Sequence, residues 1–287
     1  GQVIFEHSDH KIASDIPITE RKWFEIEGEI SLTGKISITL TDLSNLTRKY
    51  KREMKVPLEK IEKINDTLFI ATKHSGIEAL NFFNGKIEAP SIKIDSKIEK
   101  TWDFSKAIST TCVPHESSSE LYLINCPTRA VTSSIWDGSE MNWNHKPEHY
   151  AAIHFHEDDI YDFNWDTDFT FKIPLTMESG IYVMRIKCDD NEDAMPFFIC
   201  PPLGKRTAKL CVLISTFTYS IYGNHARPDY SPSWKAKIKS WSAYPHNAAE
   251  FKNYGLSTYN YHSDGSGICY ASTDRPLFNL RPGYLTF

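Results

Sequence analysis

The chain has 287 residues, 40% hydrophobic and 24% charged, which is the composition of a globular protein with room for two or three domains. A net charge of -5 argues against nucleic acid as a partner, and the longest apolar runs, 196–200 and 210–214, are too short to span a membrane. No signal peptide is evident, and the six cysteines form no C-x-x-C pair, so we expect a cytoplasmic protein without a cysteine zinc site.

Residues 1 to about 205 are predicted to form strands, because short alternating or β-rich runs are separated by turn signals such as Asn84-Gly85. The predicted strands are 23–30, 35–40, 67–72, 120–124, 149–155, 169–173, 180–186 and 195–200. Strands at this spacing are typical of β-sandwich modules. A linker is expected at Pro201-Pro202.

Beyond the linker the pattern changes to that of an α/β domain. The apolar run 209–215 predicts a strand buried on both faces, and 268–271 predicts another. Segments 232–241 and 245–254 predict short helices, the second ended by Gly255. Since an α/β sheet needs several such units, we expect the chain to be a fragment or the rest of the sheet to lie on another chain.

The first candidate site follows the predicted strand 209–215. Ligand sites in open α/β sheets lie just past the carboxyl ends of strands. This rule places Tyr219, Tyr222, Asn224 and His225 where a site is expected.

A second polar stretch packs Tyr259, Tyr261, His262 and Asp264 into nine residues with two glycines. These side chains suit iron or zinc. Because a free phenol has a pKa of about 10, tyrosine ligands would need a strongly charged ion such as Fe(III). The alternative is a plain turn centred on Asp264-Gly265.

Two further stretches have a chemical and a plain interpretation. His154 and His156 face the same side of a predicted strand and, with the acids after them, form a candidate zinc or calcium site; the alternative is a strand that runs into an acidic loop. Cys269 lies in G-I-C-Y-A, which is similar to a nucleophile elbow but ends in Ala, so a buried strand thiol is the preferred interpretation.

Several segments together resemble the N,N-dimethylformamidase large-subunit family over roughly residues 100–287. Upstream, 82–90 resembles the closing strand of a laminin-G or concanavalin-like sandwich, which that family carries as an insert. The matching segments are 125–143, 147–165, 179–186, 196–202, 218–226, 255–272 and 275–284.

The resemblance implies a mixed β and α/β fold. Residues 1–95 would be part of a laminin-G/concanavalin-like β-sandwich and 96–203 a second β-sandwich module. Residues 204–287 would begin a glutamine-amidotransferase-like α/β domain without its cysteine nucleophile.

The resemblance also implies a mononuclear iron held by two tyrosines and one glutamate. The second tyrosine falls on Tyr259 and the first on Tyr222 or Tyr219. The glutamate and the acid/base residues are expected beyond Phe287. Asn224, His225 and His262 are candidates for groups that orient the ligands.

The implied function is hydrolysis of small N-substituted formamides, with N,N-dimethylformamide giving dimethylamine and formate. The implied partners are a small subunit, further large-subunit copies and the remainder of the α/β domain if it lies on another chain. One alternative is a non-catalytic carbohydrate-binding or structural β-sandwich protein. Another is a cysteine amidase acting through Cys269.

Overall fold

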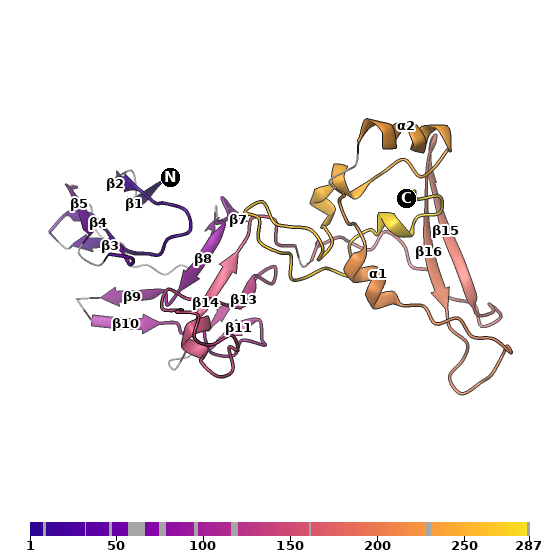
Figure 1. The fold of residues 1–287 in the computed structure, drawn as a ribbon, viewed down its shortest axis with the longest axis horizontal. Helices are drawn as coiled ribbons and strands as arrows, with labels where there is room; N and C mark the ends of the chain where they lie inside the picture. The colour runs from indigo at the N-terminus through magenta and orange to yellow at the C-terminus, as the bar shows by residue number, and fades with distance from the viewer. Residues whose placement is uncertain are drawn as a thin grey trace. The chain divides into compact units, whose positions relative to one another are not determined.

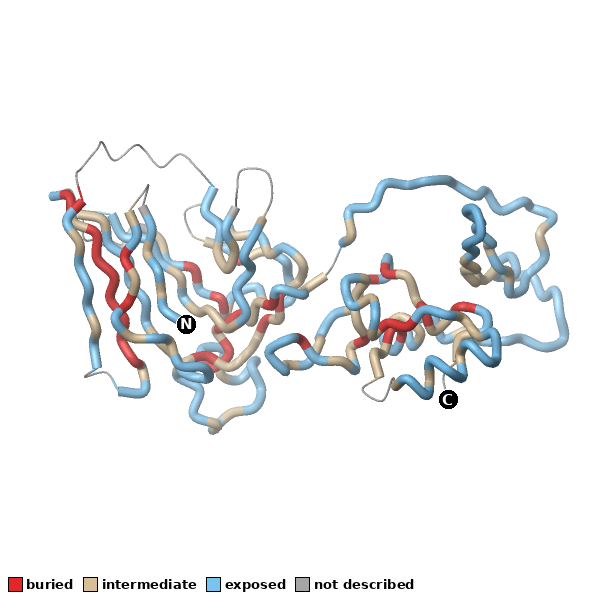
Figure 2. The backbone as a smooth tube through the Cα atoms, turned by 90° about the horizontal axis from the view of Figure 1, so that it is seen from above, coloured by how far each residue is buried: buried red, intermediate tan, exposed pale blue. Residues whose placement is uncertain are grey.

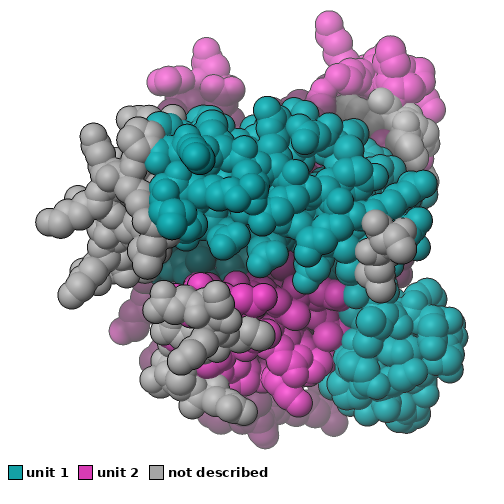
Figure 3. Space-filling view, turned by 90° about the vertical axis from the view of Figure 1, so that its left-hand side faces the viewer, with its two compact units in different colours: residues 1–70, 132–149 teal, residues 71–131, 150–287 magenta. Residues whose placement is uncertain are grey.

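The computed structural model describes residues 1–7, 10–31, 33–45, 48–56, 67–74, 79–94, 97–115, 120–160, 162–227 and 231–285. Phe287, where the predicted α/β domain stops, lies outside these ranges. The chain divides into two compact units, Gly1–Ile70 with Thr132–His149, and Ala71–Val131 with Tyr150–Phe287 (Figure 3). Among the described helices, none has the length and apolar character needed to cross a bilayer.

Unit 1 is a small antiparallel β structure. Its strands are β1 Gln2–His7, β2 His10–Pro17, β3 Phe24–Ser31, β4 Lys35–Asp42 and β5 Lys49–Lys55. The first two form a hairpin, and β3, β4 and β5 form a meander with β4 in the middle. The core joins Ile12 of β2 to Ile36, Ile38 and Leu40 of β4, which is the most buried strand (Figure 2). The apolar side chains of β4 lie on one face of the strand, and Ser37, Thr39 and Thr41 on its other face are buried as well.

The first part of unit 2 is built from short antiparallel strands (Figure 1). They are β6 Lys73–His74, β7 Ala79–Leu80, β8 Gly85–Glu88, β9 Ser91–Ile94, β10 Lys97–Thr101, β11 Cys112–Val113, β12 Leu121–Tyr122, β13 Thr128–Val131 and β14 Ala152–Phe155. Strand β14 lies between β13 and β8. Its Ile153 is buried against Trp102, Phe104 and Val113, and this core fixes the strand that carries His154.

The second part of unit 2 combines one long hairpin with short helices. The hairpin pairs β15 Gly180–Cys188 with β16 Asn191–Ile199. The α-helices are α1 Thr216–Tyr222 and α2 Pro232–Ser240. Three 3-10 turns follow them in the chain: η2 Ala248–Glu250, η3 Lys252–Tyr254 and η4 Phe278–Leu280. Another 3-10 turn, η1 Pro147–Tyr150, lies earlier, just before β14. The described chain is thus β-rich with two α-helices, which confirms the β-rich part of the predicted fold.

Most strongly alternating segments form the predicted strands, at β3, β4, β15 and β16. Two predictions were wrong, because 67–72 and 169–173 have no strand structure. Two were too long, since only β12 forms within 120–124 and only β14 within 149–155. Short apolar runs do not fix a strand without a neighbour to pair with.

The predicted strand 209–215 was also wrong. The segment has no strand structure, and the side chains of Leu210 and Leu213 are 88% and 90% exposed. A strand of a parallel sheet needs backbone partners, and no described strand pairs with this segment. The amidotransferase-like α/β domain therefore stays a prediction.

The remaining predictions after the linker had mixed outcomes. Helix α2 confirms the prediction at 232–241, with Pro232 in its first turn. Segment 245–254 forms the 3-10 turns η2 and η3 in place of an α-helix, although the turn does end at Gly255, whose φ is 80°. Segment 268–271 forms no strand.

Candidate functional site

The two tyrosines that the sequence singled out most strongly lie together. Tyr222 is the last residue of α1, and Tyr259 lies in the turn after Ser257. The Tyr259 hydroxyl donates a hydrogen bond to the Tyr222 hydroxyl at 2.6 Å, and the two rings stack with centroids 4.2 Å apart. Each side chain is about half exposed, at 50%. The pair therefore presents two phenol oxygens side by side at an open surface.

Backbone carbonyls at the end of α1 hold the tyrosine pair together. The Ile221 carbonyl accepts from the Ser257 hydroxyl at 2.9 Å and from the Thr258 N–H at 3.3 Å. The buried Arg275 guanidinium donates to the carbonyls of Ser220 and Leu256, one in each tyrosine-bearing segment. These bonds offset the weak helix propensity of the aromatic and β-branched residues in α1.

Asn224 is a buried link between three segments. Its Nδ2 donates to the carbonyls of Gly255 (3.2 Å) and Pro276 (2.8 Å), and its Oδ1 accepts from the Phe278 N–H at 2.9 Å. Its φ of 62° lies in the left-handed region, which Asn tolerates better than most residues. Asn224, two residues after Tyr222, therefore ties the end of α1 to the chain at 255 and at 276–278.

The other predicted site residues lie at different distances from this pair. The Tyr219 ring is 6.4 Å from that of Phe198 of β16, whereas the His225 ring is 6.5 Å from Tyr259. His262 is stacked on His156 in a separate polar cluster. Of the two alternatives for the first tyrosine, it is Tyr222 whose hydroxyl meets that of Tyr259.

The electrostatics of the pair bear on metal binding. The hydrogen bond with Tyr222, and then partial burial, raise the pKa of the Tyr259 hydroxyl above its ordinary value of 10.0. Adjacent ligands at about 2.0 Å from an ion, at right angles, lie roughly 2.8 Å apart. The observed 2.6 Å between the hydroxyls is close to that spacing, so the pair fits two neighbouring positions around one cation.

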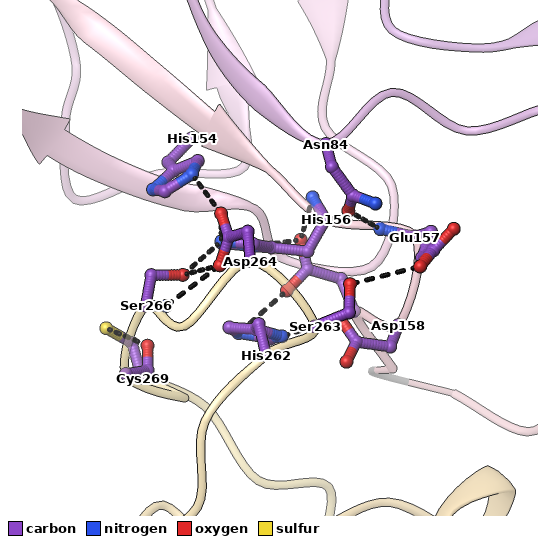
Figure 4. A network of polar contacts seen from close by, with 12 residues as sticks. Asn84, His154, His156, Glu157, Asp158, His262, Ser263, Asp264, Ser266 and Cys269 are labelled. Atoms are coloured by element: carbon purple, nitrogen blue, oxygen red, sulfur yellow. Dashed lines mark hydrogen bonds and ion pairs between the residues drawn. The ribbon is translucent and has the colours of Figure 1, made fainter. Parts of the chain in front are cut away.

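The separate polar cluster is shown in Figure 4. The predicted strand forms in part as β14, which contains His154 and ends one residue before His156. His154 Nε2 lies 2.8 Å from Asp264 Oδ2. His156 Nδ1 is 3.2 Å from Asp159 Oδ2, and its Nε2 is 2.8 Å from Ser266 Oγ. His262 Nδ1 is 2.7 Å from Asp158 Oδ1. The histidines at 154 and 156 therefore contact the polar turn at 262–266, although the two stretches are 110 residues apart in the sequence.

Burial and hydrogen bonding shift the titration of this cluster. Desolvation, with the nearby His156, lowers the pKa of His154 despite the opposing effect of Asp264. Burial opposes ionisation of Asp264, but hydrogen bonds from the Ser266 hydroxyl and N–H outweigh it and lower its pKa to about 2. Asp264 is therefore an anion at neutral pH.

Cys269 is exposed, and its thiol lies 3.7 Å from the Gly267 carbonyl. The preferred interpretation of a buried strand thiol was therefore wrong, since residues 268–271 form no strand. Among the described residues around it there is no strand followed by a sharp turn and a helix, as a nucleophile elbow has. Sequence reasoning missed Arg275, because only its paired contacts with two distant carbonyls identify its role.

Comparisons with known proteins agree with one another. A family model described as "N,N-dimethylformamidase beta subunit-like, C-terminal" matches residues 128–287. Two similar proteins are the N,N-dimethylformamidase beta subunits of Paracoccus aminophilus and of Alcaligenes sp., each 31% identical over 334 residues. The match covers 98% of this chain and 44% of each relative, so the chain spans less than half the length of these relatives.

Proposed function

The chain belongs to the N,N-dimethylformamidase beta subunit-like family, and on that premise we propose that it is part of an iron-dependent amidohydrolase of small N-substituted formamides. Tyr222 and Tyr259 are the proposed ligands from this chain. The small amide, a smaller subunit and further copies of the large subunit are the proposed partners.

The observation that supports this proposal most is the 2.6 Å contact between the two phenol oxygens. The alternative is an ordinary packing pair, in which two tyrosine rings stack and one hydroxyl donates a hydrogen bond to the other. Here the carbonyls of Ser220 and Ile221 hold the two segments in register, so both oxygens are presented together.

Iron, when bound, would supply Lewis-acid polarisation of the amide carbonyl. This chain would supply two of the ligands and hold their oxygens in position. Tyr222 and Tyr259 must each release a proton to bind, and the raised pKa of Tyr259 means that only a strongly charged ion would bring this about near neutral pH. Asn224 and Arg275 would keep the two oxygens in place through their buried bonds.

The test is the iron content of the full-length protein in its native assembly. Tyr222→Phe and Tyr259→Phe each delete one phenol oxygen while keeping the ring stack. Loss of an outer partner of a metal ligand costs about 10–100-fold in metal affinity or activity. We therefore expect a loss of at least about 100-fold in hydrolysis for these variants, with iron well below that of the parent protein.

Tyr219→Phe distinguishes the two candidates, and Tyr261→Phe is the matched control, because Tyr261 lies two residues after Tyr259 and is 69% exposed. Both should keep their iron. Full iron and turnover in Tyr259→Phe would remove that residue from the site, and loss of iron in Tyr219→Phe alone would reassign the first ligand.

A further inference from the structure

The polar cluster on β14 has the composition of a second metal site, separate from the tyrosine pair. One possible ligand atom from each of His154, His156 and Asp264 lies within 4.8 Å of those of the other two. Asp264 Oδ2 is 2.8 Å from His154 Nε2 and 3.7 Å from His156 Nε2. Ligand atoms about 2.0–2.1 Å from a tetrahedral ion lie roughly 3.4 Å apart. We propose that these three residues bind one divalent transition-metal ion of the Zn²⁺ type.

Hydrogen bonds on the far sides of the ligands orient them toward one another. Asp264 Oδ1 already accepts from the Ser266 N–H (2.8 Å) and hydroxyl (2.6 Å), which turns Oδ2 to the histidines (Figure 4). His156 Nδ1 faces Asp159, and an ion bound at Nε2 would take the place of the Ser266 hydroxyl that now lies 2.8 Å from it. A histidine ligand that donates its other N–H to a carboxylate is the usual arrangement in protein metal sites.

Ring orientation decides between two overlapping sets of ligands. The rings of His154 and His156 are tilted by 43° with centroids 4.2 Å apart, so their in-plane lone pairs can converge. His156, Asp159 and His262 also lie close together, but the His156 and His262 rings are nearly parallel, at 6°. The in-plane lone pairs of two parallel rings do not meet at one ion. We therefore assign His262 a packing role: its ring stacks on that of His156, and its Nδ1 contacts Asp158.

Access and charge also fit a bound cation. The His156 side chain is 1% exposed, whereas those of His154 and Asp264 are 15% and 25% exposed, so one side of the site is open to solvent for entry and for a water ligand. Lys86 lies opposite His154 in the β14–β8 register. The carboxylates of Asp158, Asp159 and Asp264 lie within the same cluster and favour a bound cation.

Bound metal would fasten the turn after Tyr259 to β14. The turn is closed by the His262 N–H to Ser266 carbonyl bond at 2.8 Å and by a bridge between Tyr261 and Gly267. One ion would replace the direct His154–Asp264 hydrogen bond by bonds to both histidines. The zinc form should therefore melt at a higher temperature than the metal-free form.

The experiment measures Zn²⁺ binding by competition with a chromophoric chelator, on full-length protein freed of labile metal, with iron content read separately. We expect one Zn²⁺ per chain, with affinity at least 100-fold weaker in His154→Ala and Asp264→Asn and about 10-fold weaker in Asp159→Asn. The matched control is His145→Ala, which removes a histidine paired with one carboxylate, Glu140, at 3.1 Å, and should leave zinc binding unchanged.

Asp264→Asn preserves the shape of the turn, so it tests the ligand even if His154→Ala unfolds. Absence of Zn²⁺ binding in the parent protein, or equal affinity in Asp264→Asn, would overturn the proposal, as would an increase of melting temperature by Zn²⁺ that persists in Asp264→Asn. Iron content should stay unchanged in Asp264→Asn, which separates this proposal from that for Tyr222 and Tyr259.

Discussion

Arg129 supplies side-chain hydrogen bonds to backbone carbonyls of unit 2 that lie largely outside strands and helices. Its side chain is buried at 8% exposure for the residue, and its two terminal nitrogens donate to five backbone carbonyls. The shortest of these bonds, to the carbonyls of Lys106 and Ala107, measure 2.7 and 2.9 Å. The carbonyls of Ala107 and Cys112 also accept from the Thr110 hydroxyl, so the loss of Arg129 would bear most on those of Phe104 and Lys106.

Substituting Arg129→Lys should destabilise unit 2 by about 2–6 kcal/mol. A lysine ammonium cannot reach acceptors on both sides of the guanidinium fork, so at least two carbonyls would be left unsatisfied at about 1–3 kcal/mol each. Hydrogen exchange of the β13 and β14 amides measures this loss. Arg185→Lys, in an exposed pair with Glu192, is the control and should cost under about 1 kcal/mol; equal costs would contradict the role of Arg129.

At the scale of elements, local pattern predicted the strands that alternate over a long stretch. Strands β3, β4, β15 and β16 have partners next to them in sequence, so local residues decide both strand and register. Helix α1 was missed because threonine, phenylalanine, tyrosine and isoleucine favour strands. Its helical state depends on contacts with residues 255–258 and 275, which no local pattern contains.

The same reasoning applies to the candidate site. Tyr222 and Tyr259 could be chosen as candidates from the residues and the family resemblance, but the choice between Tyr222 and Tyr219 depends on where α1 ends. The pairing of His154 with Asp264 could not be predicted, because it joins a strand to a turn 110 residues away.

The end of α1 provides a test of how the tyrosine pair is held. A Cβ at Gly223 would lie 2.6 Å from the Tyr219 carbonyl oxygen and would also collide with the Leu277 side chain. The φ of -54° suits alanine, so any effect is steric rather than conformational. We expect Gly223→Ala to cost about 1–3 kcal/mol and to displace Tyr222, with loss of iron from the full-length protein.

Gly180→Ala in β15 is the matched control, because the nearest atom to its Cβ would be at an ordinary 3.5 Å. This variant should keep its stability and its iron. If Gly223→Ala also keeps both, the close packing at the end of α1 does not position the tyrosine.

At the scale of the whole molecule, the chain carries one part of the proposed site. It spans 44% of the length of its relatives, and two phenol oxygens leave most positions around an iron ion to other groups. Activity, substrate and partners are therefore measured on the full-length protein together with the proposed partner subunits.

The most direct test is resonance Raman spectroscopy of the full-length assembled protein, with excitation in its visible absorption band. Phenolate bound to Fe(III) absorbs visible light, so we predict enhanced tyrosinate ring vibrations that shift when the protein contains ring-deuterated tyrosine. These vibrations should weaken in Tyr222→Phe and in Tyr259→Phe and persist in Tyr261→Phe. An iron-loaded protein without tyrosinate vibrations, or vibrations unchanged in both variants, would contradict the account.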